Sequence, residues 1–299
     1  MSSLTKIFGK ATILFILMGG ISDASDVPIQ LARIMGGRSG AAVVIDVQSG
    51  HILAIYRPEV AARRLVRPAS AFKPFTLLAL LQSGKLSRTD SLVCQRNLRV
   101  GTHDLSCSHP QIGPLQAVAA LAYSCNDFFA TFGQRLSGPE LQAAFQKAGF
   151  ASPTGLAEGE AVGSIHTART KEERQLQAVG EGDMRATPLE MVAAYRNIAL
   201  KRMSSESTAA DRMVFQGLEE ATAYGMSRLA SPTGIKIAGK TGTPKAEDGN
   251  WSNGWFAGYA PADKPEIALV VFVERGTGPS DAAPLAAEIF NSWWKAKQK

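Results

Sequence analysis

The chain is organised around the sequence Arg67-Pro-Ala-Ser-Ala-Phe-Lys-Pro-Phe75, which opens a very apolar segment that ends at Leu81. In a helix over this segment, Ser70 and Lys73 stand three residues apart and lie on one face. A serine hydroxyl is a weak nucleophile until a base lies within hydrogen-bond reach. A lysine one turn away can be that base if its pKa is lowered. Pro74 has no N–H to return to the Ser70 carbonyl, so the first turn is expected to be irregular.

Composition describes an ordinary globular chain of 299 residues, with 45% hydrophobic and 19% charged residues. The length allows one large domain or two small ones. The net charge of +6 is spread along the chain, with no basic helix and no aromatic-basic interleaving. Nucleic acid is therefore not expected as a partner.

The N-terminus has the composition of a signal peptide. Lys6 and Lys10 precede the apolar stretch 11–21, which is short for a membrane span, and Ser22-Asp-Ala24 supplies small residues before a cleavage point. We expect residues 1–24 to be a signal peptide and residues 25–299 to form the exported domain, periplasmic or extracellular. An uncleaved anchor is the alternative.

Export permits disulfides, and Cys94 and Cys107 enclose a short polar segment that a bridge would close. The Cys94–Cys107 disulfide is the expectation, with Cys125 left as a small buried thiol. His103 and His109 lie close by, so a Cys/His metal site is the alternative. No two ligand pairs show the spacing typical of zinc, and no metal or other cofactor is expected.

Hydrophobic patterning predicts strands at both ends of the chain and helices between them. The strands are expected at residues 40–47, 51–56, 235–238, 253–259 and 267–274. The helices are expected after Ser70 and at 115–122, 127–136, 139–148, 188–200, 213–229 and 282–297. This order predicts a single α+β domain in which N- and C-terminal strands share an antiparallel sheet below a mostly helical middle.

Two more short motifs carry polar chemistry. Ser124-Cys-Asn126 follows an apolar helix and offers a hydroxyl that can pass a proton and an amide that can donate and accept. Lys240-Thr-Gly-Thr243 follows the predicted strand 235–238 and the predicted turn residue Gly239. It offers a cation, two hydroxyls and a glycine against which a ligand can lie.

The order Ser-x-x-Lys, Ser-x-Asn, Lys-Thr-Gly is the three-part signature of serine penicillin-recognising enzymes. The chain resembles the transpeptidase domain of a penicillin-binding protein from about Gly40 to its end. Flanking segments support the resemblance: residues 40–55, Gly180-Glu-Gly182, Thr187-Pro-Leu-Glu-Met191 and Gly254-Trp-Phe-Ala-Gly-Tyr-Ala-Pro261.

The resemblance implies a mechanism of acyl transfer. Ser70 would attack a D-alanyl-D-alanine stem peptide of peptidoglycan, or a β-lactam that mimics it. Lys73 would take the Ser70 proton, and Ser124 would relay it toward the departing amine.

The resemblance also assigns the binding groups. Asn126 would hold a substrate amide, Lys240 would supply positive potential, and Thr241, Gly242 and Thr243 would bind the substrate carboxylate and backbone. Backbone N–H groups of Ser70 and Thr243 would form the oxyanion hole.

Three activities are compatible with these motifs. The first is a D,D-transpeptidase or D,D-carboxypeptidase, the second a β-lactamase of the same fold, and the third a non-catalytic sensor of β-lactams or muropeptides. The expected ligands are the stem peptide and β-lactams, and the sequence does not identify envelope protein partners.

Overall fold

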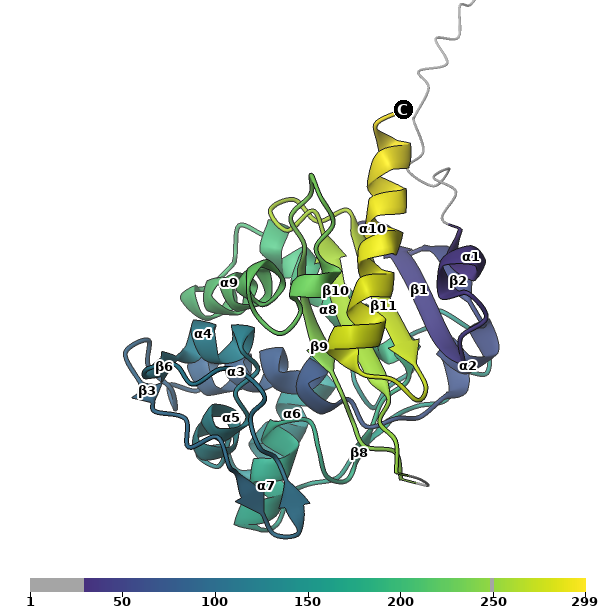
Figure 1. Cartoon of the computed structure of the whole chain (residues 1–299). Coiled ribbons are helices and arrows are strands. Elements are labelled where there is room, and N and C mark those ends of the chain that lie inside the picture. Colours follow the sequence, from purple (N-terminus) through teal and green to yellow (C-terminus); the bar gives the residue numbers. More distant parts are fainter. Residues whose placement is uncertain (1–29, 248–249) are drawn as a thin grey trace, which may run out of the picture.

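A five-stranded antiparallel sheet forms the centre of the structure (Figure 1). The computed structural model describes residues 30–247 and 250–299. In spatial order the strands are β2 (Ile52–Tyr56), β1 (Gly40–Asp46), β11 (Ile267–Val273), β10 (Gly254–Ala260) and β9 (Ala238–Gly242). β1 pairs with β11 along its whole length, from Gly40 opposite Val273 to Asp46 opposite Ile267. The predicted sheet of N- and C-terminal strands is confirmed.

Both faces of the sheet are buried, which explains why its strands are continuous apolar runs. Val43 and Val270 belong to the core shared with the helical region, whereas their neighbours Val44 and Val271 pack on the opposite face. That second face is covered by α10 (Ala283–Lys297) and α1 (Leu31–Met35), and α10 lies across the sheet in Figure 1.

The helical region lies between β2 and β9 in the sequence. Its helices are α2 (Pro58–Arg63), α3 (Lys73–Gln82), α4 (Ala117–Ala122), α5 (Asn126–Gly133), α6 (Gly138–Ala148), α7 (Lys171–Ala178), α8 (Pro188–Met203) and α9 (Ala209–Ala223). α8 packs beneath β1, β10 and β11, and α3 packs among α5, α6 and α9. The α+β class predicted from the sequence is confirmed.

Capping residues set where several of these helices begin. Ser137, Thr170, Thr187 and Thr208 each accept a hydrogen bond from the third helical N–H of α6, α7, α8 and α9 in turn, and the acidic side chain at that position bonds back. Short elements complete the helical region: the 3-10 turns Ala69–Phe72 and Arg228–Ala230, and the two-residue strands β3 (Ser91–Leu92), β4 (Arg99–Val100), β5 (His103–Asp104), β6 (Leu115–Gln116), β7 (Ser164–Ile165) and β8 (Met184–Arg185). A π turn, Gly278–Ala282, follows β11 and leads into α10.

One strand differs from its prediction. The segment 235–238 was expected to be the strand, with Gly239 as a turn, but β9 starts at Ala238 and contains Gly239, Lys240 and Gly242. Gly239 packs against β10: a Cβ there would lie 2.4 Å from the Phe256 ring. Glycine is required at this position because the neighbouring strand's side chain is close, and it does not mark a turn.

The proposed signal peptide, residues 1–24, lies outside the described residues. None of the helices in the described ranges combines the length and apolar character that crossing a membrane requires.

Candidate active site

Ser70 lies in a 3-10 turn, Ala69–Phe72, that leads directly into α3. Because Pro74 has no N–H, the Ser70 carbonyl accepts from the N–H of Lys73 instead. The predicted irregular first turn is confirmed. Ala69 is held at φ 47°, an unfavourable conformation for alanine, and its N–H donates to the Gly180 carbonyl at 2.8 Å.

Lys73 is completely buried, and oxygen acceptors surround its ammonium group. Nζ lies 2.7 Å from the Ser124 carbonyl oxygen, 3.2 Å from Ser124 Oγ and 2.5 Å from Asn126 Oδ1. Burial lowers the pKa of Lys73 to about 8, and nearby thiol groups and Glu181 act in the opposite direction. A lysine with this pKa can give and take a proton near neutral pH.

The second motif forms the bend between α4 and α5. Ser124 has φ 57°, which directs both its carbonyl and its hydroxyl toward Lys73. Asn126 Nδ2 donates to the Leu105 carbonyl at 2.8 Å, so the amide oxygen faces the lysine. The backbone N–H of Asn126 donates to Cys107 Sγ at 3.2 Å.

The third motif lies on β9 and faces the 3-10 turn. Lys240 is completely buried and donates to the Thr241 carbonyl at 3.1 Å. Burial, and after it the charge of Lys73, holds the pKa of Lys240 well below its usual range. The N–H of Thr241 donates to Ser227 Oγ at 3.0 Å, and Thr243 Oγ1 accepts from the Gly278 N–H at 3.0 Å.

Gly242 sets how closely β9 approaches Ser70. A Cβ at Gly242 would lie 2.6 Å from the Pro68 carbonyl oxygen and 3.1 Å from the Ala71 nitrogen. Any side chain at this position would push the strand away from the turn that carries the serine. The glycine therefore fixes the width of the site.

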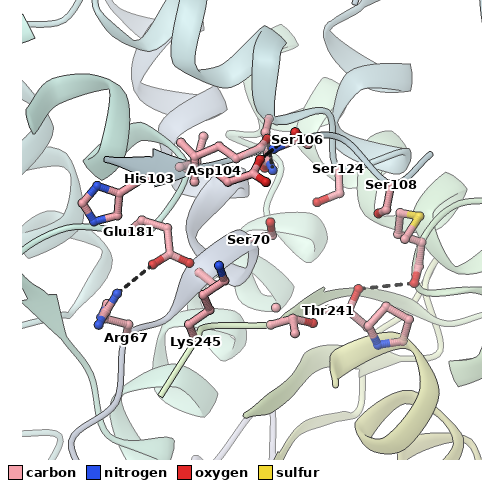
Figure 2. Close-up of a pocket in the computed structure, with 18 of the residues that line it drawn as sticks. Arg67, Ser70, His103, Asp104, Ser106, Ser108, Ser124, Glu181, Thr241 and Lys245 are labelled. Carbon is pink, nitrogen blue, oxygen red and sulfur yellow. Dashed lines mark hydrogen bonds and ion pairs between the residues drawn. The ribbon is translucent and has the colours of Figure 1, made fainter. Parts of the chain in front are cut away.

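The three motifs meet at a pocket of about 500 Å³ (Figure 2). The predicted residues that line it are Ser70, Ser124, Asn126, Thr241, Gly242 and Thr243. Lys73 and Lys240 are buried and do not line it. Figure 2 shows Ser70 between Ser124 on one side and Lys245 and Thr241 on the other.

Several further side chains that line the pocket, among them Arg67, Glu181 and Lys245, were not singled out as site residues from the sequence. Arg67 forms an ion pair with Glu181, Nη1 to Oε2 3.4 Å, and Lys245 extends the cationic side of the pocket. Burial raises the pKa of Glu181, while Arg67 acts against that rise. Arg67 lies at the start of the nucleophile motif and Glu181 in Gly180-Glu-Gly182, so both were within segments already noted. Ser227, whose hydroxyl accepts from the Thr241 N–H, belongs to none of the sequence motifs, so nothing in the sequence pointed to it.

The cysteines differ from the expected Cys94–Cys107 disulfide. All three are free and buried, and Cys107 Sγ lies 3.8 Å from Cys125 Sγ, far beyond the length of a disulfide bond. Cys125, expected to be left as a small buried thiol, is buried; it caps α5 and joins the same cluster. Backbone N–H groups of Arg96 and Asn126 point at the sulfurs and orient them inward.

Comparison with known proteins identifies the family of the chain. The family described as "Penicillin binding protein transpeptidase domain" matches residues 40–293. The chain belongs to the penicillin-binding protein transpeptidase family. The resemblance inferred from the three motifs is confirmed.

Curated relatives match most of this chain, but at low sequence identity. Stage V sporulation protein D of Bacillus subtilis is 28% identical over 280 residues, covering 79% of this chain and 43% of that protein. Peptidoglycan D,D-transpeptidase FtsI of Escherichia coli K12 is 26% identical over 297 residues, covering 85% and 50%. The chain spans about half the length of these relatives.

Solved structures confirm the fold. A Pseudomonas aeruginosa PBP2 crystal structure superposes with a TM-score of 0.78 at 22% identity, over 88% of this chain and 75% of that one. The transpeptidase domain of Burkholderia pseudomallei penicillin-binding protein 3 gives 0.79 at 20% identity, over 89% and 92%. The transpeptidase fold is thus retained at low sequence identity.

Proposed function

We propose that the protein catalyses serine acyl transfer on peptidoglycan stem peptides, as a D,D-transpeptidase or D,D-carboxypeptidase, and is acylated by β-lactams. The observation that carries the proposal is the buried Lys73 ammonium, in contact with Ser124 and Asn126 directly behind the turn that presents Ser70 to the pocket. A nucleophile, a base of lowered pKa and a relay hydroxyl are what acyl transfer needs.

The reaction begins when Ser70 Oγ attacks the carbonyl carbon of the penultimate D-alanine. Its proton passes to Lys73 Nζ as the new C–O bond forms. Ser124 Oγ, 3.2 Å from that nitrogen, passes a proton to the departing amine as the C–N bond breaks. The resulting ester is then attacked by an amine, which gives a cross-link, or by water, which gives a shortened stem peptide.

Binding of the substrate uses the cationic half of the pocket. The hydroxyls of Thr241 and Thr243 receive the terminal carboxylate, and the buried Lys240, which donates to the Thr241 carbonyl, supports this strand from behind. Backbone N–H groups of Ser70 and Thr243 stabilise the oxyanion, where loss of one donor typically costs roughly 10²–10³ in rate. Asn126 binds a substrate amide through the second N–H of Nδ2, since the first N–H donates to the Leu105 carbonyl and Oδ1 faces Lys73.

Location follows from the same proposal, because peptidoglycan is outside the cytoplasm. Residues 1–24 act as the export signal, cleavage follows Ala24, and residues 25–299 form the exported domain. The Helicobacter pylori PBP2, whose structure with MreC matches this chain with a TM-score of 0.80, is bound by another protein in that complex. Envelope proteins, and not nucleic acid, are the proposed class of macromolecular partner.

The test is incubation of the purified protein with a stem pentapeptide and an amine acceptor, read by mass spectrometry. Loss of one D-alanine, with or without addition of the acceptor, is expected. Ser70→Ala should abolish both products, and Ser83→Ala, an exposed serine after the same helix, should not. Acylation by penicillin without any peptide product would favour the sensor function, and rapid β-lactam hydrolysis would favour the β-lactamase.

A further inference from the structure

Behind the second motif, four residues that commonly bind metal ions are packed together. Cys94, Cys107, His109 and Cys125 are all buried, and one ligand atom from each lies within 4.8 Å of all the others. They come from separate loops, since Cys94 follows β3, Cys107 and His109 follow β5, and Cys125 precedes α5. No single turn of the chain brings them together, so the cluster is a product of the tertiary fold.

The histidine is oriented as a ligand would be. His109 Nδ1 lies 2.7 Å from the Pro110 carbonyl oxygen, which can only accept, so Nδ1 carries the proton. Nε2 then presents a lone pair, and it is buried with no hydrogen-bond partner among the residues that the structure describes. A buried polar atom without a partner is costly, and a bound cation would remove that cost. A carbonyl that fixes the tautomer is the usual outer contact of a metal-bound histidine.

The sulfur atoms have the spacing and the donors of a thiolate site. Two sulfurs bound to one tetrahedral zinc at about 2.3 Å are roughly 3.8 Å apart, and Cys107 Sγ lies 3.8 Å from Cys125 Sγ. Each sulfur also faces a backbone N–H, from Arg96 to Cys94 at 3.3 Å, from Asn126 to Cys107 at 3.2 Å, and from Phe128 to Cys125 at 3.4 Å. Such donors stabilise negative charge on sulfur.

We propose that Cys94, Cys107, His109 and Cys125 bind one structural Zn²⁺ in tetrahedral geometry. Three thiolates and an imidazole are a common zinc ligand set, and a set without carboxylates does not suit Mg²⁺ or Ca²⁺. Binding displaces the remaining thiol protons to solvent and fills all four positions, so no water is bound and the metal takes no part in the acyl-transfer chemistry.

The ordinary alternatives leave part of the cluster unexplained. One disulfide would use two of the three sulfurs and leave His109 Nε2 without a partner. Three packed thiols without a metal would likewise leave the buried His109 Nε2 with no hydrogen-bond partner among the described residues. One divalent cation satisfies all four groups together.

The zinc would fix one wall of the active site. The segment 93–114 contains only short two-residue strands, yet Leu105, Ser106 and Ser108 line the pocket. Asn126 is bonded to this segment twice, through Cys107 Sγ and the Leu105 carbonyl. Zinc is thereby a positioning element for the amide that contacts Lys73. In the sequence analysis a Cys/His site was only the alternative to a disulfide, because Cys107 and His109 form a single pair with short spacing and no second such pair accompanies them.

Metal content of the full chain is the direct test. The protein is purified without chelator or metal-binding tag and measured by inductively coupled plasma mass spectrometry. One zinc per chain is expected for the wild type, with His109→Ala and Cys107→Ser losing most of it. His51→Ala, an exposed histidine in the turn before β2, is the matched control and should keep it. His109→Cys supplies a fourth thiolate and should retain zinc if His109→Ala fails to fold.

A second measurement uses wild-type protein alone. Zinc removal by a strong chelator should lower Tm by more than about 5 °C, and Co²⁺ should restore it with the visible absorption of tetrahedral cobalt–thiolate. Zinc-free wild type with free thiols, a Cys107–Cys125 disulfide in non-reducing peptide mapping, iron in place of zinc, or equal zinc in His109→Ala would overturn the proposal. Slower penicillin acylation after zinc removal is also expected; this last readout rests on the proposed function, whereas the metal content does not.

Discussion

Lys73 Nζ donates to Asn126 Oδ1 across 2.5 Å, and the other end of that amide is held by the Leu105 carbonyl. The amide cannot turn without losing one of these bonds, so the lysine always faces an oxygen. Burial favours the neutral amine, whereas the neighbouring thiol groups and Glu181 favour the ammonium. The resulting pKa of about 8 leaves both forms accessible near neutral pH.

The first prediction concerns pH. If neutral Lys73 accepts the Ser70 proton, the acylation rate should rise about tenfold per pH unit below the lysine pKa and level off above about 8. The direction follows because raising pH removes the lysine proton. Fluorescent penicillin labelling, timed from about pH 6 to about pH 10, measures it. A rate that is flat or falls over that range would show that neutral Lys73 is not the base.

The second prediction is that Asn126→Asp shifts this pH profile of acylation to higher pH. A carboxylate in place of the amide oxygen would stabilise the Lys73 ammonium and raise its pKa. A lysine pKa that is higher by about one pH unit lowers the neutral fraction at pH 7 about tenfold. Acylation at pH 7 should fall accordingly and recover in part at high pH. Asn197→Asp, an exposed change on α8 away from the pocket, is the control. A loss that is equal at all pH values would indicate misplacement of the lysine instead.

Periodicity and turn residues were sufficient to predict most of the fold. The apolar runs that became β1 and β11 are buried on both faces, so their strand character was readable from local sequence. α7 was missed because it is polar except near its end, and its position depends on the Thr170 cap and on packing against α5. Gly239 was assigned to a turn because the nearby Phe256 ring is invisible in the sequence.

The motif residues at the site could be predicted from the sequence, but the residues that hold them in place could not. Ser70 and Lys73 share a local segment, so their spacing was informative. Ser227, which holds the Thr241 N–H, comes from a separate element and has no motif. The cysteine pairing was also inaccessible, because closeness along the chain favoured Cys94–Cys107 whereas the fold places Cys107 beside Cys125.

The third prediction tests the strained residue before the nucleophile. Gly180 has φ +82°, and a Cβ there would lie 1.8 Å from the Ala69 carbonyl oxygen. Gly84 has φ +69° with nothing within 4 Å of its Cβ position. Gly84→Ala should cost about 1 kcal/mol, and Gly180→Ala roughly 3 kcal/mol or more because the clash adds to the strain.

Thermal unfolding and penicillin labelling separate these two glycines. Gly180→Ala should lower Tm by several degrees more than Gly84→Ala and should also slow labelling, since Ala69 must move with Ser70. Gly84→Ala should label at the wild-type rate. Equal unfolding temperatures for the two variants would mean that the loop of Gly180 yields easily and does not hold Ala69.

The last prediction is that the penicillin acyl-enzyme hydrolyses slowly. Fast hydrolysis needs a base that activates water, and in one β-lactamase group this is the glutamate of a Glu-x-x-Leu-Asn stretch, which does not occur between Asn126 and Lys240. The described carboxylates lining the pocket are already engaged. Glu181 pairs with Arg67. Asp104 accepts from the N–H of Ser106, whose hydroxyl and N–H lower the aspartate pKa.

A carbamate on the motif lysine is the other known route to such a base. Burial of Lys73 favours the neutral amine from which a carbamate forms, but the carbamate oxygens would need donors. The groups around Nζ include the Ser124 carbonyl and Asn126 Oδ1, which can only accept. With a chromogenic cephalosporin we expect a burst of one product per enzyme followed by almost no turnover, and added bicarbonate should not change it. Sustained hydrolysis at about ten turnovers per second, an ordinary enzyme rate, would identify the protein as a β-lactamase, and stimulation by bicarbonate would show that the acceptors around Lys73 do not prevent the carbamate.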